Sequence, residues 1–279
     1  MTIYSHSKLS TFEQCPLKFK LRYIDKIKPD IEQTIEGFLG IKVHETLEWV
    51  YNEMLKGREK EIQLDELIEY YAISWNRDYN SEIKIVKEEF QAEDYFNKGI
   101  RFLINYFKSH APFKDDTIEL EKRIFLDLED GNKIIGYIDR LVHNKETNIF
   151  EIHDYKTTGT LKSQEELDKD RQLALYSLAI RDMFPEANDV HLIWHFLDFN
   201  KKIISKRTKE QLNQLKQDIL QLIKKIESTN EFPPCPSALC GWCDFQGHCP
   251  LFDESKKNNI QNNNAQDNRF QTDKFQKTL

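Results

Sequence analysis

The sequence predicts an α/β fold in which a mixed β-sheet is flanked by helices. Three observations predict it: helical periodicity dominates the first hundred or so residues, three β-rich segments then follow one another, and helix and strand patterns alternate afterwards. A sheet has two faces to bury, and helices packed on it are the natural cover. With 279 residues, 39% of them hydrophobic, the chain is long enough for one large domain.

The N-terminal part is predicted to be helical. Serines near residue 7 offer caps for the first helix, and Pro16 is expected to break it. Further along, Val43, Leu47 and Val50 lie near one stripe of a second helix, which Gly57 ends. The expected helical segments are residues 7–25, 37–57, 63–79 and 90–110.

A meander of strands is predicted next, because turn-forming residues at 130–132 and 144–148 separate three β-rich runs. Pro185 then stops one helix, and Thr208 caps another. The expected elements are strands at 117–128, 132–143 and 148–158, a helix at 165–184, strands at 189–199 and 201–208, and a helix at 209–228.

One domain is expected over residues 1–254. The polar, asparagine-rich tail at residues 255–279 is expected to be disordered. Within the domain we expect a helical part at about 37–110, a sheet-bearing core at about 115–228, and a cysteine cluster at 235–250 together with Cys15.

Charge and hydropathy exclude some classes of protein. The net charge of −7 argues against a basic coat on nucleic acid, although local lysines and a bound cation could still contact a few phosphates. No apolar run is long enough to span a membrane, and the N-terminus has no basic-then-apolar signal region. We therefore expect a soluble, cytoplasmic protein without a membrane partner.

Charged residues stand at the ends of two apolar runs. Asp139 lies near the end of the second strand, and Asp154 and Lys156 lie on one face of the third. Two carboxylates can hold Mg²⁺ or Mn²⁺, and a nearby lysine can orient a water molecule or meet developing charge. A flat hairpin would keep the two carboxylates apart, so the strands must splay or bend. Taken alone, such residues are more often solvated surface charges.

The wider pattern resembles a known family. G-x-I-D-R around Asp139, D-Y-K-T around Asp154, and a following helix with Q-x-x-x-Y are similar to the PD-(D/E)XK nuclease superfamily, especially its RecB and AddB branch. The resemblance implies a restriction-endonuclease-like core with bent strands. It also implies that Asp139, Asp154 and Lys156 are catalytic, and that the Tyr155 backbone carbonyl is a metal ligand beside the two aspartates.

Four further residues fit this resemblance. His44, in a G-x-x-x-H setting, corresponds to a histidine that reaches the metal in the branch, although a histidine on an amphipathic helix is more often a core residue. Gln172 and Tyr176 lie one helical turn apart and are expected to support the lysine or contact DNA; the alternative for Tyr176 is a packed residue at the core edge. Glu121 corresponds to a supporting carboxylate of some relatives, but Glu119 and Asp127 lie on the same strand.

Five cysteines suggest a second metal site. Cys240, Cys243 and Cys249 form a C-x-x-C-x₅-C motif, and Cys15 lies near the other end of the chain. One cysteine before the core and three after it resemble the [4Fe–4S] site of AddB-type and CRISPR-adaptation nucleases. We assign those four as ligands with a structural role and leave Cys235 over. Zinc is the open alternative, because four thiolates do not by themselves select the metal.

The resemblance implies a Mg²⁺- or Mn²⁺-dependent deoxyribonuclease that acts on DNA, as an exonuclease or on single-stranded or duplex ends and flaps, in repair or recombination. The alternatives are a non-catalytic DNA-binding or scaffold module and a nuclease of CRISPR adaptation. No helicase motif or P-loop is present, so a helicase or repair partner is possible. Lys18, Lys20 and Arg22 are candidate DNA contacts, but a run of charges is usually a solvated face.

Overall fold

The computed structural model describes residues 2–58, 62–129 and 131–252, and it contains two compact units. The described residues of the first unit lie within Met1–Leu9 and Gln33–Ser228, and those of the second within Ser10–Glu32 and Thr229–Leu279. The expectation of a disordered tail from residue 255 concerns residues outside the described ranges.

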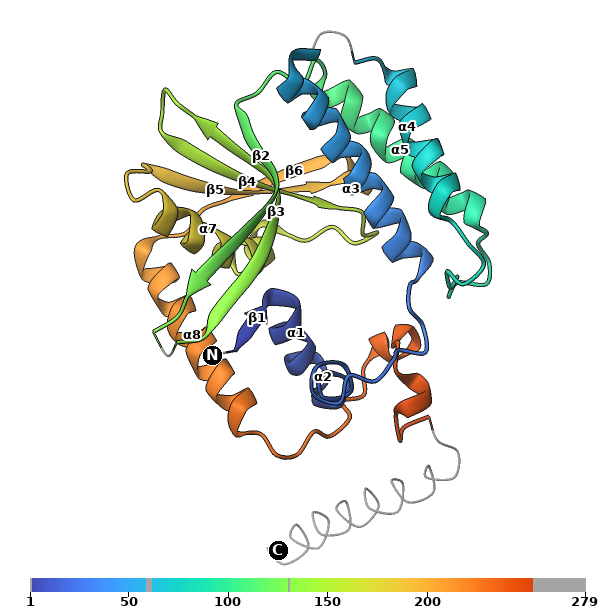
Figure 1. Cartoon of the computed structure of the whole chain (residues 1–279), viewed down its shortest axis with the longest axis vertical. Helices are drawn as coiled ribbons and strands as arrows, with labels where there is room; N and C mark the ends of the chain where they lie inside the picture. The colour runs from blue at the N-terminus through green and yellow to red at the C-terminus, as the bar shows by residue number, and fades with distance from the viewer. Residues whose placement is uncertain (1, 59–61, 130, 253–279) are drawn as a thin grey trace, which may run out of the picture. The chain divides into compact units, whose positions relative to one another are not determined.

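The first unit contains a six-stranded mixed sheet in the order β1-β3-β4-β5-β6, with β2 also paired to β3 (Figure 1). β1 is parallel to β3, β4 is parallel to β5, and the other pairs are antiparallel. The strands are β1 (Ile3–Ser5), β2 (Thr117–Asp127), β3 (Lys133–Asn144), β4 (Ile149–Lys156), β5 (Asp189–Phe196) and β6 (Lys201–Ser205). The predicted α/β fold is confirmed; β1 was not predicted, because three residues carry too little periodicity.

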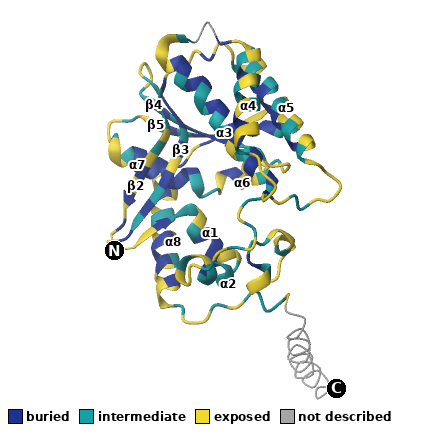
Figure 2. Ribbon diagram, turned by 45° about the vertical axis from the view of Figure 1, so that its right-hand side comes forward, coloured by how far each residue is buried: buried dark blue, intermediate teal, exposed yellow. Residues whose placement is uncertain are grey.

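Helices cover both faces of this sheet. The first group is α3 (Ile35–Glu53), α4 (Leu64–Asp78) and α5 (Ala92–His110), and the second is α7 (Gln172–Met183) and α8 (Lys209–Ser228). On one face α3 contacts β2 and β3, with α5 and α4 packed around it, and on the other α7 contacts β2, β4 and β5, with α8 packed against α7 (Figures 1 and 2). The expected glycine stop lies in η2 (Met54–Arg58), where Gly57 has φ 86°.

The predicted helix at residues 165–184 is two helices, α6 (Gln164–Asp168) and α7. The break is stabilised by Arg207, whose guanidinium donates to the carbonyls of Leu167 (2.6 Å) and Asp170 (3.0 Å). Asp170 Oδ1 also accepts from the backbone N–H of Gln172 at 2.9 Å. Gln172 therefore stands in the first turn of α7. Periodicity could not show this, because the contact with Arg207 is tertiary.

One edge of β3 divides between two partners. Residues 133–135 pair with β1, whereas residues 140–144 pair with β4. Between them, residues 136–139 have no backbone partner on that edge among the described strands. The sheet opens at this fork, so the segment of β3 that carries Asp139 and the segment of β4 that carries Asp154 can approach each other. The geometric difficulty of a flat hairpin is thereby removed.

A large aromatic and aliphatic core lies between the sheet and helices α3, α4 and α5. Its members include Phe38, Tyr71, Phe102 and Tyr106, and from the sheet Tyr155. Figure 2 shows buried residues along the strands and the inner sides of these helices. Burying such side chains is the main favourable term in folding, at roughly 25 cal/mol per Å² of apolar surface. This core therefore fixes the face of β4 that lies opposite Asp154.

The described part of the second unit brings together residues 10–32 and 229–252, which are far apart in sequence. Helix α1 (His6–Gln14) enters it, and α2 (Pro16–Phe19) and η1 (Lys20–Ile24) follow, with the expected break near Pro16. Phe19 stacks on Phe232, with ring centroids 6.4 Å apart, and the backbone N–H of Asp30 donates to Asp244 O at 2.8 Å. The short helices η4 (Ala238–Trp242) and η5 (Gln246–His248) carry the cysteine motif.

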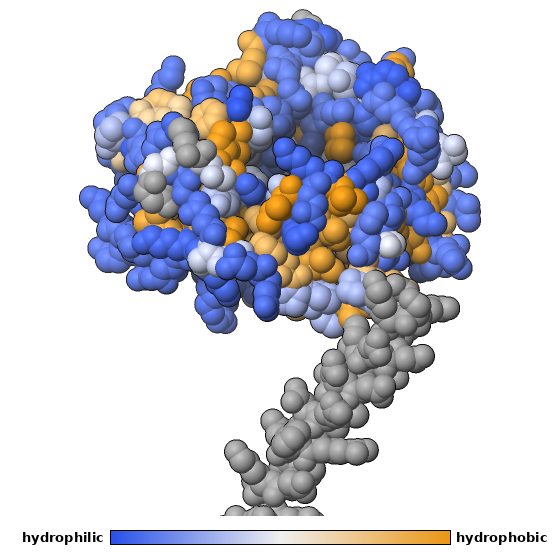
Figure 3. Space-filling view, turned by 60° about the horizontal axis from the view of Figure 1, so that its bottom comes forward, coloured by the Kyte–Doolittle hydropathy of each residue, from blue (hydrophilic) through white to orange (hydrophobic). Residues whose placement is uncertain are grey.

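None of the helices within the described residues is both long and apolar enough to cross a membrane. Figure 3 shows that hydrophilic residues cover most of the face in view, with smaller hydrophobic patches between them.

Candidate metal centre and catalytic strand

Three side chains form a donor cluster at the fork of the sheet: His44 of α3, Glu121 of β2 and Asp139 of β3. One ligand atom from each lies within 4.8 Å of the others. His44 Nε2 lies 2.7 Å from Tyr155 O, and since a carbonyl only accepts, this nitrogen carries the proton. The lone pair of Nδ1 then faces Asp139 Oδ2 at 3.4 Å. A nitrogen and carboxylate oxygens are thus gathered as a divalent cation requires.

Glu121 reaches the cluster through an unusual backbone. Its φ is 45°, in the left-handed region that residues other than glycine rarely adopt. Its neighbours Leu120 and Lys122 pair with Arg140 and Ile138, so Glu121 stands opposite Asp139. Such strain persists where the surrounding structure imposes it, and it is commonly found at functional sites.

A second group of contacts joins β4 to α7. Lys156 Nζ donates to Asp154 Oδ1 at 2.9 Å and to Gln172 Oε1 at 3.1 Å, and Gln172 Nε2 donates to Asp154 Oδ1 at 3.1 Å. Asp154 is 4% exposed. Its Oδ2 lies 2.8 Å from Lys156 Nζ but has no hydrogen bond of good geometry among the described residues. Asp154 therefore holds the lysine and keeps one oxygen without a well-aligned donor.

Tyr176 supports this group from behind. It is 7% exposed and hydrogen-bonds Gln172. Its ring lies so close to Gly136 of β3 that a Cβ there would be 2.2 Å from Tyr176 Cε1. Tyr176 is thus packed at the edge of the core and also bonded to Gln172, which binds Lys156.

The charges of the site are shifted by their surroundings. Burial raises the pKa of Asp139 to about 6, with Asp154 adding to the rise and His44 opposing it. Partial burial raises the pKa of Glu121 to about 7, and Asp139 adds to it. Burial lowers the pKa of Lys156, but Asp154 and Asp139 outweigh this and raise it overall. Lys156 is therefore an ammonium group at neutral pH, whereas the two acids ionise less readily than free carboxyl groups and Glu121 is only about half ionised at pH 7.

A cavity of about 500 Å³ opens beside the donor cluster. Besides His44, Glu121 and Asp139, its lining includes Glu45 and Glu48. Four carboxylates around one cavity repel a phosphate unless cations neutralise them. The cavity is thus suited to cations first and to an anionic substrate only in their presence.

The predicted site residues fall into two adjoining groups. The donor cluster contains His44 and Asp139, and the contacts between β4 and α7 contain Asp154, Lys156, Gln172 and, behind them, Tyr176. Asp154 does not join the donor cluster, and Glu121, the least secure assignment, does. The signal for choosing it over Glu119 and Asp127 is its register opposite Asp139, which requires the pairing of β2 with β3.

The cysteines share one small cavity in the second unit. All five are free thiols and line a space of about 60 Å³, together with Lys18 and Leu251. The backbone N–H of Ser237 donates to Cys240 Sγ at 3.3 Å. In the described residues, no three cysteines have sulfur atoms all within 4.8 Å of one another.

The candidate DNA contacts near the N-terminus are engaged within the second unit. Lys18 lies 2.6 Å from Asp244, Arg22 also pairs with Asp244, and Lys20 pairs with Asp25. Their positive charge is therefore largely neutralised by neighbouring carboxylates.

The model of the PD-(D/E)XK nuclease superfamily matches residues 3–250. The crystal structure of a protein named "Putative exonuclease" from Eubacterium rectale is similar with a TM-score of 0.51 and 12% identity, over 85% of this chain and 86% of that one. The crystal structure of SSO0001 has a TM-score of 0.39 and 14% identity, over 90% of this chain and 86% of that one. No match is found among curated protein sequences.

Proposed function

Because the chain belongs to the PD-(D/E)XK nuclease superfamily, we propose that it is a metal-dependent deoxyribonuclease. The proposed reaction is hydrolysis of DNA phosphodiester bonds, at single-stranded or duplex ends or flaps, in repair or recombination. The observation that carries the proposal is the donor cluster of His44, Glu121 and Asp139, next to Lys156 and Asp154.

The residues fit a divalent cation. The donor set of two carboxylates and an imidazole is suited to Mn²⁺ or Mg²⁺. Burial raises the pKa values of Asp139 and Glu121, and the charge of Asp139 adds to the rise for Glu121, so a cation between the two carboxylates would relieve their repulsion. His44, Glu121 and Asp139 would hold the ion, with Asp154 and the Tyr155 carbonyl at its margin. When bound, such an ion acidifies water and neutralises charge on a phosphate oxygen.

Lys156 acts as a fixed ammonium group. Asp154 and Gln172 hold its Nζ, so it can donate to an attacking water or to a phosphate oxygen without first paying for reorientation. It is not a general base, because its pKa is raised. Gln172 keeps Lys156 and Asp154 together, and Tyr176 keeps Gln172 in place.

The cysteine cavity is proposed to hold a [4Fe–4S] cluster through Cys15, Cys240, Cys243 and Cys249. The proposal is supported by the C-x-x-C-x₅-C motif and by the cavity that these cysteines line with Cys15. Zinc is the alternative, because four thiolates do not by themselves select the metal. The hydrogen bond to Cys240 Sγ is of the kind that tunes ligating sulfurs.

The test is cleavage of end-labelled single-stranded and duplex DNA with Mn²⁺ or Mg²⁺, comparing wild type with Asp154→Asn and Lys156→Ala. We expect metal-dependent cleavage that falls by about 10²-fold or more in both variants, the scale of losing one preorganised charge-stabilising group. The control is Asp127→Asn, because Asp127 is exposed on β2 and forms an ion pair with Lys133, outside the donor cluster. Absence of cleavage by folded wild type would favour a DNA-binding module.

A further inference from the structure

Tyr155 holds two members of the donor cluster by its backbone. Its N–H donates to Asp139 Oδ2 at 2.9 Å, and its carbonyl accepts from His44 Nε2 at 2.7 Å. These bonds orient both side chains from one peptide segment. The position of Tyr155 therefore sets the distance between His44 and Asp139.

The backbone ladder alone does not fix Tyr155 against β3. The last pair of β3 with β4 before the fork is Arg140 with His153, and within the described residues no further pair follows toward Tyr155. Beyond His153, β4 is still paired with β5, but its contacts with β3 involve side chains. One of them comes from Arg140, whose side chain lies on the opposite face from its neighbour Asp139.

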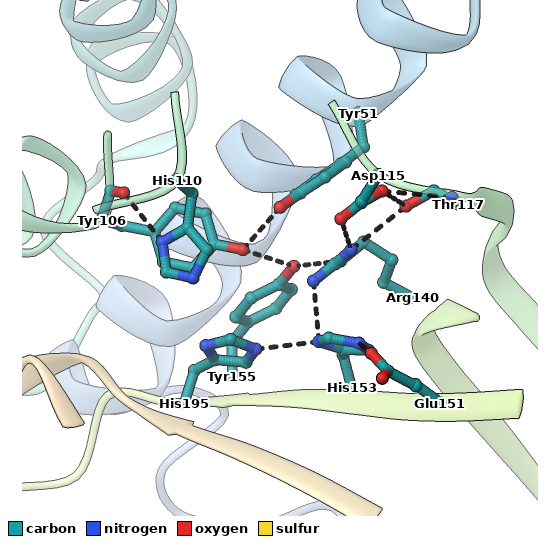
Figure 4. A network of polar contacts seen from close by, with 10 residues as sticks. All are labelled: Tyr51, Tyr106, His110, Asp115, Thr117, Arg140, Glu151, His153, Tyr155 and His195. Atoms are coloured by element: carbon teal, nitrogen blue, oxygen red, sulfur yellow. Dashed lines mark hydrogen bonds and ion pairs between the residues drawn. The ribbon is translucent and has the colours of Figure 1, made fainter. Parts of the chain in front are cut away.

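Arg140 is placed to hold the Tyr155 side chain. It is 1% exposed, and its Nε donates to the Tyr155 hydroxyl at 2.9 Å (Figure 4). The other two nitrogens of the planar guanidinium donate to Asp115, to Thr117 Oγ1 at 3.1 Å and to His153 Nδ1 at 2.7 Å. The guanidinium also lies 4.2 Å from the ring centroid of Tyr51. A guanidinium group bonded on all these sides is held in one orientation.

Two histidines on strands of the sheet hold the Arg140 guanidinium in place. His153 Nδ1 accepts from Arg140, so its protonated nitrogen is Nε2, which lies 3.1 Å from Glu151 Oε2. His195 Nε2, at 2.9 Å from His153 Nδ1, is then also a donor to it. The Tyr155 hydroxyl further contacts Tyr106, at 3.2 Å.

We propose that Arg140 is a positioning residue for the metal centre, acting through the Tyr155 hydroxyl on the far face of the sheet. It fixes Tyr155 where the ladder ends, and Tyr155 in turn fixes Asp139 and His44. The inference rests on the proposed function, since it assumes that the donor cluster holds a cation. Outer partners of this kind typically change metal affinity by about 10- to 100-fold when removed.

The test measures Mn²⁺ binding directly, by calorimetry on metal-free protein, beside the Mn²⁺ concentration for half-maximal cleavage. Arg140→Lys keeps the positive charge but loses the planar guanidinium group. Tyr155→Phe keeps the backbone and the ring but loses the hydroxyl. Tyr51→Phe is the matched control, because it removes another buried hydroxyl, bonded to Tyr106 at 2.7 Å, from the same cluster. Mn²⁺ binding that persists in Asp139→Asn is assigned to other sites and subtracted.

We expect both Arg140→Lys and Tyr155→Phe to weaken Mn²⁺ binding by about 10-fold, and the double variant to be no weaker than Arg140→Lys alone. Tyr51→Phe should lose thermal stability yet bind Mn²⁺ as wild type does. Unchanged Mn²⁺ affinity in both variants, or an equal loss in Tyr51→Phe, would overturn the inference. If wild type itself binds no Mn²⁺ at Asp139, the proposed function fails instead.

Discussion

At the scale of single residues, the site gathers acids whose charges oppose one another. Asp139 and Glu121 both have raised pKa values, and His44 presents a lone pair toward Asp139. A cation removes this repulsion, whereas protons compete with it. The acids should therefore govern both metal affinity and the response to pH.

Glu121 is a proposed metal ligand whose place beside His44 and Asp139 depends on the fold. Glu121→Gln removes one anionic ligand and should raise the Mn²⁺ concentration for half-maximal cleavage by about 10-fold or more, while saturating Mn²⁺ restores part of the rate. Glu119→Gln is the control, because Glu119 lies two residues away on the same strand and pairs with Lys122. A metal titration that shifts equally in both variants would contradict the assignment.

Asp139 should make the metal-free protein less stable at high pH. Its folded pKa of about 6 exceeds that of an unfolded aspartate, so its stabilising contribution is present below pH ~4 and is lost as the pH rises through 6. About two units correspond to roughly 3 kcal/mol. Asp139→Asn should then be more stable than wild type at pH 8 by about 1–3 kcal/mol, and nearly equal at pH ~4 or below.

The measurement for Asp139 is urea unfolding of both proteins in chelator at the two pH values. The comparison isolates Asp139, because all other titrating groups are common to the two chains. Glu121 is exposed, so water screens its charge and its share is smaller. The same stability difference at pH ~4 and pH ~8 would show that the pKa of Asp139 is not raised in the folded protein.

At the scale of elements, the fork in β3 and the break before α7 build the site together. The fork opens the edge of residues 136–139, and the break sets Gln172 in the first turn of α7, beside Asp154 and Lys156. Gly136 lets the two elements meet, since Tyr176 of α7 packs where a side chain would otherwise stand.

Gly136→Ala should disturb this contact. The added methyl group would lie 2.2 Å from Tyr176 Cε1, so the ring must move and its support of Gln172 is lost. We expect destabilisation of about 1–3 kcal/mol, as for overpacking, and a lower cleavage rate at saturating metal. Gly37→Ala is the control, because a Cβ there makes only an ordinary 3.6 Å contact with Thr34 Oγ1. Equal rates for the two variants would remove Tyr176 from the supporting set.

At the scale of the whole molecule, the chain closes on itself. The second unit is built from two segments that are separated in sequence by residues 33–228 of the first unit. Cys15 of one segment lines a cavity with Cys240, Cys243 and Cys249 of the other. Bringing such distant segments together has an entropic cost, and a cluster ligated by both segments would offset it.

Cys240→Ser should therefore lose the metal and lower the unfolding temperature, whereas Cys235→Ser, which changes a cysteine of the same cavity, should retain both. Anaerobically purified wild type should carry about four iron atoms and as many sulfides per chain. Zinc in place of iron would support the alternative ligand. Retention of the metal by Cys240→Ser would mean that Cys235 is one of the four ligands.

The amino-acid sequence by itself determined the elements with long, regular patterns and the residues with a motif. The helices α3, α4, α5 and α8 and the strands β2 to β6 follow from local periodicity, and the α/β fold follows from their order. Asp139, Asp154, Lys156 and His44 could be named because their spacing matches a family motif. How they act remains a proposal, because spacing carries no distances.

Only the tertiary structure decided how these residues meet. The fork of β3, the strain at Glu121, the break at residues 169–171 and the hold of Arg140 on Tyr155 all depend on contacts between segments distant in sequence. Each is a compromise in which packing or a buried hydrogen bond overrides local preference. Asp139 therefore lies with Glu121 and His44 rather than with Asp154 alone, because the partner strands of β3, and not its own sequence, set where its edge opens.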